Sequence, residues 1–369
     1  MRETWLGWML LSATMMAASA MAAQEPVTVA VVGLEHDHAM GFFYSVLPHH
    51  PEVKLVAVVE ADPQLRAKYE ERFHLDPALF VDGMDAMYRR GKPDAVLVYT
   101  SIARHRAVVV DAARHGVSAM VEKPLATTLA DAIAMRDAAR AHHTQLLVNY
   151  ETTWYASNAY VLKAADDGQL GTVHKVIVRD GHEGPKEIGV SPTFLNWLTD
   201  PVKNGAGAMF DFGCYGADLM TVMMHGEAPL SVTAVAQTDK PEVYPKVDDD
   251  ATIVLHYKTA QAVLLPSWNW TTGVKNMEVY GTKEQATTVK AEGVELLGAD
   301  GKASSLTAPA LAADEADSLC YLVGVLHGQV KPEGDLTALD TNMVVMQILD
   351  AARRSAKEGR TVMVMPVPK

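Results

Sequence analysis

The chain has 369 residues and a formal net charge of −13, from 45 Asp and Glu against 32 Lys and Arg. This length is too great for one ordinary core and predicts two domains, each large enough to bury a sizeable interior. The acidic balance repels phosphate backbones and anionic lipid surfaces, which argues against nucleic-acid and membrane-surface binding. A small neutral or polar ligand is favoured instead.

The first residues have the pattern of an export signal. Trp5 to Ala18 is short and apolar, follows Arg2, and precedes Ala20-Met21-Ala22, a sequence that suits signal peptidase. The run is shorter than the roughly 20 apolar residues of a membrane-spanning helix. We therefore expect a signal peptide over residues 1–22, an exported, periplasmic mature protein, and no membrane anchor after cleavage.

Residues 27–148 alternate short apolar runs with helical patterns, which predicts a Rossmann-like α/β domain with a parallel sheet and crossover helices. The runs are Val27 to Gly33, Leu55 to Glu60, Asp94 to Thr100, Val117 to Glu122 and Gln145 to Val148. Thr128 to Asp131 is a capping-box pattern, so a helix should continue from there to about Ala141. Lys123 then lies at a strand end, at the sheet edge where open α/β folds bind ligands.

Residues 149–369 have longer, alternating strands, which predict a substrate-binding α+β domain with a large, mostly antiparallel sheet. The strands are Val173 to Arg179, Ser231 to Gln237, Thr252 to Tyr257, Ala262 to Trp268 and Asn276 to Tyr280. Helices are expected over Tyr155 to Ala165, Gly216 to Met224, Ser318 to Leu326 and Thr341 to Ala356. The Ala- and Gly-rich stretch from Gly298 to Ala313 is interpreted as a surface loop.

The first strand runs into a turn where a dinucleotide fold has the pattern G-x-G-x-x-G. Gly33 supplies the first glycine, but Glu35 and His38 replace the second and third. A glutamate there adds bulk and a like charge beside a pyrophosphate. Helix-start N–H groups could still hold phosphate, and His36 or His38 could donate hydrogen bonds to it.

The second strand ends at Glu60, where an acid accepts hydrogen bonds from the adenosine ribose hydroxyls and repels a 2′-phosphate. This favours NAD over NADP. A metal site formed by the run from Glu35 to His38 is disfavoured, because adjacent residues on a turn rarely converge on one ion. We predict no metal.

These residues make the chain resemble the Gfo/Idh/MocA oxidoreductases, named for glucose-fructose oxidoreductase and inositol dehydrogenase. The resemblance covers nearly all of the chain after the signal. It depends on the strand ending at Gly33, on Asp94 to Thr100 followed by His105, on Gly116 to Pro124 with its Glu-Lys-Pro step, on Gly205 to Asp218, and on Val279 to Thr282. It implies a catalytic role for Lys123 and places Thr100, His105, Glu122 and Lys123 beside the cofactor.

The family motif D-x-G-x-H stands here as Asp211-Phe212-Gly213-Cys214-Tyr215, so a tyrosine replaces the histidine, as in one branch of the family. Oxidising an alcohol requires a group that takes the hydroxyl proton while hydride leaves the carbon. Tyr215 and Lys123 could do this jointly, with the ammonium and the nicotinamide ring favouring tyrosinate. Asp211 would orient the sugar or the lysine.

Three further side chains are substrate candidates. His182 follows a sheet strand, and the flat faces of Trp154 and Tyr155 suit the C–H face of a pyranose. The leading hypothesis is an exported oxidoreductase that transfers hydride between a sugar or sugar-derived alcohol and a tightly bound NAD. The alternatives are an NAD-dependent glycoside-cleaving enzyme that forms a transient keto sugar, and a non-catalytic sugar-binding protein. By analogy, the open sheet face suits a homo-oligomer.

Overall fold

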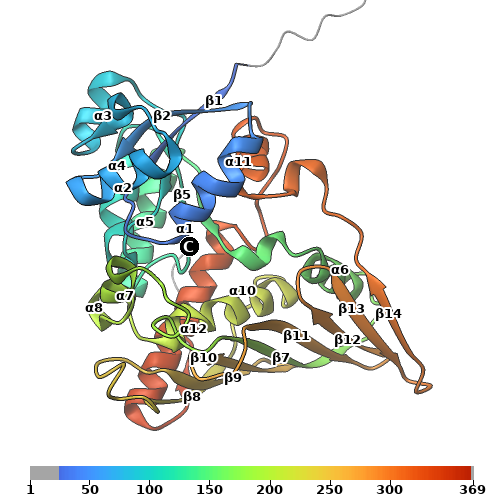
Figure 1. The fold of residues 1–369 in the computed structure, drawn as a ribbon. Coiled ribbons are helices and arrows are strands. Elements are labelled where there is room, and N and C mark those ends of the chain that lie inside the picture. Colours follow the sequence, from blue (N-terminus) through green and yellow to red (C-terminus); the bar gives the residue numbers. More distant parts are fainter. Residues whose placement is uncertain (1–24, 367–369) are drawn as a thin grey trace, which may run out of the picture.

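The computed structural model describes residues 25–366, and the predicted signal peptide lies outside that range. Two sheets organise the chain, one above the other in Figure 1. No helix within residues 25–366 combines the length and apolar character needed to cross a membrane. The predicted fold class, a Rossmann-like sheet followed by a large mostly antiparallel sheet, is confirmed.

The first sheet has six parallel strands in the order β3-β2-β1-β4-β5-β6. They are β1 Val27–Val32, β2 Val53–Val59, β3 Phe80–Val81, β4 Ala95–Val98, β5 Ser118–Glu122 and β6 Leu146–Asn149. Its helices are α1 His38–Gly41, α2 Pro63–Phe73, α3 Met84–Arg90, α4 His105–Arg114 and α5 Leu129–Ala141. The short β3 was not predicted. Because β1, β4 and β5 are parallel neighbours, their carboxyl ends meet at one edge of the sheet.

Helix α5 begins where the capping pattern predicts. Thr128 Oγ1 accepts a hydrogen bond of 3.1 Å from Asp131 N and donates one of 2.7 Å to the Asp131 carboxylate. The first bond satisfies a backbone N–H group that a helix start would otherwise leave open, and the second joins the two side chains. The chain between Lys123 and this cap therefore has fixed ends, which holds the lysine at the strand edge.

The second sheet has nine strands in the order β14-β13-β12-β11-β7-β10-β9-β8-β15. They are β7 Val173–Gly181, β8 Ser231–Gln237, β9 Asp250–His256, β10 Gln261–Ser267, β11 Val274–Gly281, β12 Glu284–Val289, β13 Gly293–Gly298, β14 Ala303–Thr307 and β15 Val362–Met363. Every pair is antiparallel except β7 with β10. The predicted loop from Gly298 to Ala313 is wrong, since it contains β14. That strand is largely exposed and polar, so it lacks the apolar alternation that marks a strand.

The helices of this half are α6 Ala156–Asp166, α7 Pro192–Leu198, α8 Pro201–Asn204, α9 Ala208–Asp211, α10 Gly213–Met223, α11 Ser318–Leu326 and α12 Leu339–Glu358. Helices α10 and α12 cover one face of the nine-stranded sheet and lie between the two sheets (Figure 1). Helix α11 contributes Leu319 and Leu322 to the same core as Val29 and Val31 of β1. The second half of the chain therefore helps to bury the first sheet.

Candidate functional site

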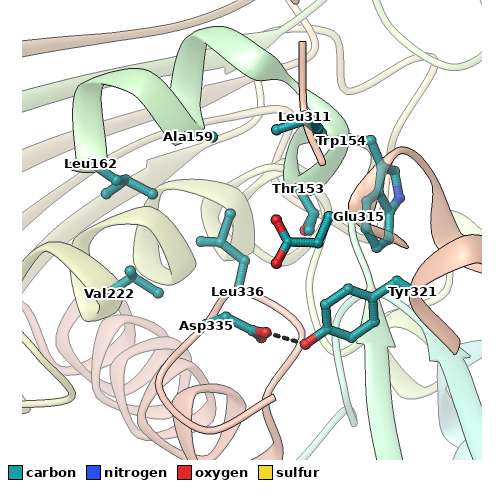
Figure 2. Close-up of a pocket in the computed structure, with 10 residues that line it drawn as sticks. All are labelled: Thr153, Trp154, Ala159, Leu162, Val222, Leu311, Glu315, Tyr321, Asp335 and Leu336. Carbon is teal, nitrogen blue, oxygen red and sulfur yellow. Dashed lines mark hydrogen bonds between the residues drawn. The ribbon is translucent and has the colours of Figure 1, made fainter. Parts of the chain in front are cut away.

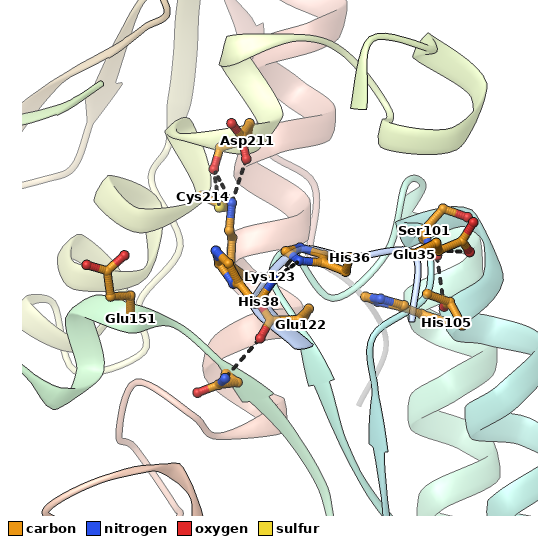
Figure 3. Close-up of polar contacts among 12 residues, drawn as sticks. Glu35, His36, His38, Ser101, His105, Glu122, Lys123, Glu151, Asp211 and Cys214 are labelled. Carbon is orange, nitrogen blue, oxygen red and sulfur yellow. Dashed lines mark hydrogen bonds and ion pairs between the residues drawn. The ribbon is translucent and has the colours of Figure 1, made fainter. Parts of the chain in front are cut away.

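A buried ion pair joins the two halves of the chain. Lys123, at the end of β5, donates hydrogen bonds from Nζ to Asp211 Oδ1 at 2.5 Å and to the Asp211 carbonyl oxygen at 3.0 Å (Figure 3). The other carboxylate oxygen of Asp211 accepts from Trp268 Nε1 at 3.0 Å. Burial alone would lower the pKa of Lys123, but the Asp211 carboxylate outweighs it and the pKa is raised. Lys123 is therefore an ammonium, and Asp211 orients the lysine.

The helix that carries Asp211 is fixed by Asp248. The Asp248 carboxylate accepts hydrogen bonds from Gly207 N at 2.8 Å and Met209 N at 2.7 Å, which caps the start of α9. A Cβ on Gly207 would lie 1.7 Å from the Asp248 carbonyl oxygen, so only glycine permits this approach. Gly207 thus helps to position Asp211 through the backbone.

Tyr215 lies beside this pair in α10. Its ring centroid is 5.0 Å from Lys123 Nζ, and its side chain is buried. The prediction that the ammonium and the nicotinamide ring together favour tyrosinate concerns the site with its cofactor bound and stays a prediction. Burial, together with the Glu151 carboxylate, raises the pKa of Tyr215 well above its usual value. The desolvation of a buried phenolate is the largest cause, so in this structure both Tyr215 and Lys123 hold their protons.

Glu122 connects Lys123 to the first turn. Its carboxylate lies 2.8 Å from His38 Nδ1 and accepts from Asn149 Nδ2 at 3.0 Å. Burial would raise the pKa of Glu122, but His38 and Lys123 outweigh it and the pKa is lowered. An anionic Glu122 therefore stands directly before Lys123 and adds a smaller contribution than Asp211 to the raised pKa of the lysine.

His36 and His38 do converge with Glu122, their candidate ligand atoms lying within 4.8 Å of one another. The geometry nevertheless opposes a metal. His36 Nδ1 accepts a hydrogen bond of 3.1 Å from His38 N, so in the neutral ring the proton is on Nε2, the atom that faces Glu122. A metal-binding histidine instead donates from the nitrogen that does not bind the ion.

The turn after β1 has the geometry of a dinucleotide turn. Gly33 has φ +82°, and a Cβ there would lie 2.5 Å from Thr100 Cγ2 at the end of β4. Glu60, at the end of β2, accepts from Leu34 N at 2.8 Å and from Asp62 N at 2.9 Å. The carboxylate that would meet the adenosine ribose is thus held against the turn itself.

The carboxylate of Glu35 is held by two donors that follow β4. It accepts from Ser101 N at 2.7 Å (Figure 3) and from Arg104 Nη1 at 3.3 Å. These two donors offset the negative charge that the sequence places on this turn. The Glu35 carbonyl oxygen accepts from Trp197 Nε1 of α7 at 3.0 Å. A helix from the second half of the chain therefore clasps the turn.

His105 offers an acceptor without a partner. Its Nδ1 lies 3.1 Å from the Leu125 carbonyl oxygen, and its Nε2 is buried with no hydrogen-bond partner within residues 25–366. Burial lowers the pKa of His105 to about 4, so the ring is neutral and Nε2 has a free lone pair. This atom, the close approach at Gly33 and the strand-end Glu60 fit a bound dinucleotide.

The predicted substrate residues lie at different distances from Lys123. His182 packs edge-on against Phe212, with ring centroids 4.9 Å apart, and so borders the site. Tyr155 donates a hydrogen bond of 2.5 Å to the Glu151 carboxylate and lies at the outer edge of the site. Trp154 instead lines a cavity of about 160 Å³ whose walls include neither Lys123 nor Tyr215 (Figure 2).

Sequence reasoning missed a second lysine and its neighbours. Lys275 Nζ lies 4.9 Å from the Tyr215 ring centroid and pairs with Glu151. Asp180 is directly opposite Lys275 in the β7–β11 ladder and is buried. The available signal was strand parity: Val176, Val178 and Asp180 alternate onto the buried face of β7. A charged residue at such a position warrants a functional hypothesis.

Comparison with known proteins agrees with this geometry. Residues 27–150 match the model for the oxidoreductase family with an NAD-binding Rossmann fold, and residues 159–287 match the GFO/IDH/MocA C-terminal domain. Inositol 2-dehydrogenase of Rhizobium meliloti is 24% identical over 84% of this chain and 92% of its own. A solved aldose-aldose oxidoreductase of Caulobacter crescentus has a TM-score of 0.74 and 24% identity, with 92% of this chain and 99% of that chain covered.

D-apiose dehydrogenase of Paraburkholderia graminis is 36% identical, but the match covers only 32% of this chain and 31% of the relative. The chain thus spans about a third of that protein. The two domain models together cover more than half of the sequence, in the order and at the positions of the two sheets. The chain belongs to the Gfo/Idh/MocA oxidoreductase family and has an NAD-binding Rossmann domain.

Proposed function

We propose that the protein is an exported oxidoreductase that transfers hydride between a sugar or sugar-derived alcohol and NAD. The observation that carries the proposal is the buried Lys123 ammonium, fixed by Asp211 beside the Tyr215 ring at the carboxyl edge of the first sheet. Bound NAD would supply the hydride acceptor. Inositol 2-dehydrogenase and an aldose-aldose oxidoreductase, both similar to this chain, support a polyol or sugar as the substrate.

The residues of the site would handle the oxygen of the reacting carbon. Lys123 and Tyr215 are both protonated at rest, so each can donate a hydrogen bond to that oxygen. In alcohol oxidation Tyr215 must first release its own proton to solvent; it can then take the hydroxyl proton as hydride leaves the carbon, while the Lys123 ammonium stabilises the negative charge that develops on the oxygen. In carbonyl reduction the same two groups can donate the proton directly. Their resting protonation state therefore suits the reduction half-reaction without rearrangement.

A tightly bound cofactor would solve a supply problem in an exported enzyme, because a periplasm offers little free NAD. The contact between Trp197 of α7 and the Glu35 carbonyl oxygen supports retention, since it closes the second half of the chain over the dinucleotide turn. One sugar would then reduce the bound cofactor and another would reoxidise it. Export itself is proposed from the apolar segment and the Ala-x-Ala pattern that precede residue 23.

The first experiment is to purify the protein from the exported fraction, denature it and identify the released ligand by absorbance and mass spectrometry. Stoichiometric NAD is the expected result. The refolded or intact protein is then offered pairs of aldoses and polyols, with products identified by mass. An oxidised sugar together with a reduced one supports the proposal, whereas protein that holds no dinucleotide and binds none when NAD or NADP is added contradicts it. Release of an aglycone without net redox change would instead indicate glycoside cleavage.

A further inference from the structure

We propose that Asp180 and Lys275 form a second recognition pair of the substrate site, which binds two neighbouring hydroxyl groups of a polyol or sugar beyond the reacting carbon. This inference rests on the proposed function and specifies how the substrate is selected. Neither residue belongs to the Glu-Lys-Pro step or to the Asp211 to Tyr215 motif. Both lie in the second sheet, near the end of β7 and the start of β11, and form what we call the sheet wall of the site.

The first argument is position. Lys275 Nζ lies 4.9 Å from the Tyr215 ring centroid and 6.0 Å from that of Phe212. Lys123 Nζ lies 5.0 Å and 5.8 Å from the same two centroids. Two ammonium groups from different sheets therefore converge on one pair of aromatic rings. A substrate whose reacting oxygen meets Lys123 is then within reach of Lys275.

The second argument is an unsatisfied acceptor. The side chain of Asp180 is 2% exposed, and its Oδ2 has no hydrogen-bond partner among the residues described. A buried polar atom without a partner costs about 1 to 3 kcal/mol, so such atoms in folded proteins usually have a ligand or a role. A substrate hydroxyl would supply the missing partner.

The third argument is charge. Lys123 is neutralised by Asp211, and Lys275 by Glu151, whose side chain is 48% exposed. Burial, with Glu151, raises the pKa of Asp180 to about 8 against the opposing effect of Lys275, so this carboxyl group is largely neutral at pH 7. The sheet wall therefore offers an ammonium donor and a carboxyl group without net repulsion toward a neutral polyol. A vicinal diol complements this pair, because one hydroxyl can accept from Lys275 while its neighbour bonds to Asp180.

The test measures binding, so that it does not depend on turnover. NAD-loaded protein is titrated by calorimetry with myo-inositol, D-glucose, 2-deoxy-D-glucose, 3-deoxy-D-glucose and D-glucuronate. The variants are Asp180→Asn, Lys275→Met and, as a matched control, Asp218→Asn. Asp218 of α10 is also a buried carboxylate with an unpartnered oxygen and a raised pKa, but it is no cross-strand neighbour of Lys275.

For the neutral sugars that bind, Lys275→Met should weaken binding by about 10-fold to 100-fold, as expected for a hydrogen bond to a charged group, and Asp180→Asn by about 2-fold to 10-fold, as expected for one between neutral groups. Asp218→Asn should leave affinity unchanged. The decisive readout is discrimination: one deoxy sugar should bind wild type more weakly than D-glucose, and the Asp180→Asn variant should bind both equally.

Equal affinity of wild type and both variants would overturn the recognition pair and leave the proposed function intact. So would an equal loss in Asp218→Asn, which would point to a general packing effect. Tighter binding of D-glucuronate that depends on Lys275 but not on Asp180 would overturn the pair as a diol site. It would show that Lys275 alone binds an anionic group of the substrate. Failure of every sugar to bind wild type would contradict the proposed function and this inference with it.

Discussion

The site has two walls: the strand-end wall, where Lys123 at the end of β5 meets Asp211, and the sheet wall of Asp180 and Lys275. Buried carboxyl groups have different surroundings in the two. Asp211, on the strand-end wall, accepts from Lys123 and Trp268, and the Lys123 ammonium keeps its pKa low despite burial. Asp180, on the sheet wall, is equally buried but has an oxygen without a partner, and burial raises its pKa to about 8. The first wall is complete without a ligand, whereas the second lacks a partner that a substrate could supply.

Removing the charge of Lys123 should have the largest effect. Lys123→Met leaves the buried Asp211 carboxylate unpaired, which should cost about 3 to 5 kcal/mol of stability. Turnover should fall by at least about 1,000-fold, because the group that stabilises charge on the substrate oxygen is gone. Urea unfolding and sugar turnover measure the two effects.

The double variant Lys123→Met, Asp211→Asn separates them. It removes the unpaired charge, so most of the stability should return while turnover stays low. If turnover recovered with stability, Lys123 would be a structural residue. The strand-end wall would then have no catalytic role to set against the sheet wall.

Removing the hydroxyl of Tyr215 should have the next largest effect. Tyr215→Phe keeps the ring that the two lysines contact but removes a proton donor, and turnover should fall by about 100-fold. No hydrogen bond of this hydroxyl occurs within the described residues, so thermal stability should hardly change. Kinetics and a melting curve on the same preparation check this. An unchanged turnover number would assign proton transfer to another group.

The unpaired state of Asp180 predicts a pH dependence of stability. Its pKa is about 8 in the folded protein against an ordinary 3.8, so between these values the folded state holds a proton that the unfolded state releases. This contribution is complete below about pH 4 and is lost as the pH rises toward 8. The groups that face Asp180 are Lys275, Glu151, Lys123, Tyr155 and Cys214.

Over that window the wild type should lose up to about 1.4 kcal/mol of stability per pH unit relative to Asp180→Asn. Urea unfolding of both proteins at several pH values gives the difference directly. A difference that does not vary with pH would mean that Asp180 is already ionised, and thus paired as Asp211 is. The contrast between the two walls would then disappear.

The two walls also differ in how well the sequence predicts them. The strand-end wall was predicted, because Lys123, Gly33 and Glu60 each follow an apolar run that ends at the same sheet edge. The sheet wall was not, because Asp180 and Lys275 meet only through the pairing of β7 with β11, which the chain does not encode locally. Trp154 is the opposite case, because the sequence places it among the substrate residues and the structure places it in another cavity. Its indole donates to Asn149 and packs against Tyr321, contacts that its position in the sequence does not indicate.

The smallest predicted effect concerns the clasp on the dinucleotide turn. Trp197→Phe keeps an aromatic ring against His36 but leaves the Glu35 carbonyl oxygen without its donor. The loss should be about 1 kcal/mol of stability, the usual worth of a buried hydrogen bond. If the clasp retains NAD, the dinucleotide should also dissociate several-fold faster, which a competition experiment with excess unlabelled NAD measures. The alternative is that the substitution loosens the whole fold. Wild type in a urea concentration that lowers its free energy of unfolding by the same amount controls for this. Faster release in the variant than in that control would place the effect at the turn, because the two samples then have the same global stability.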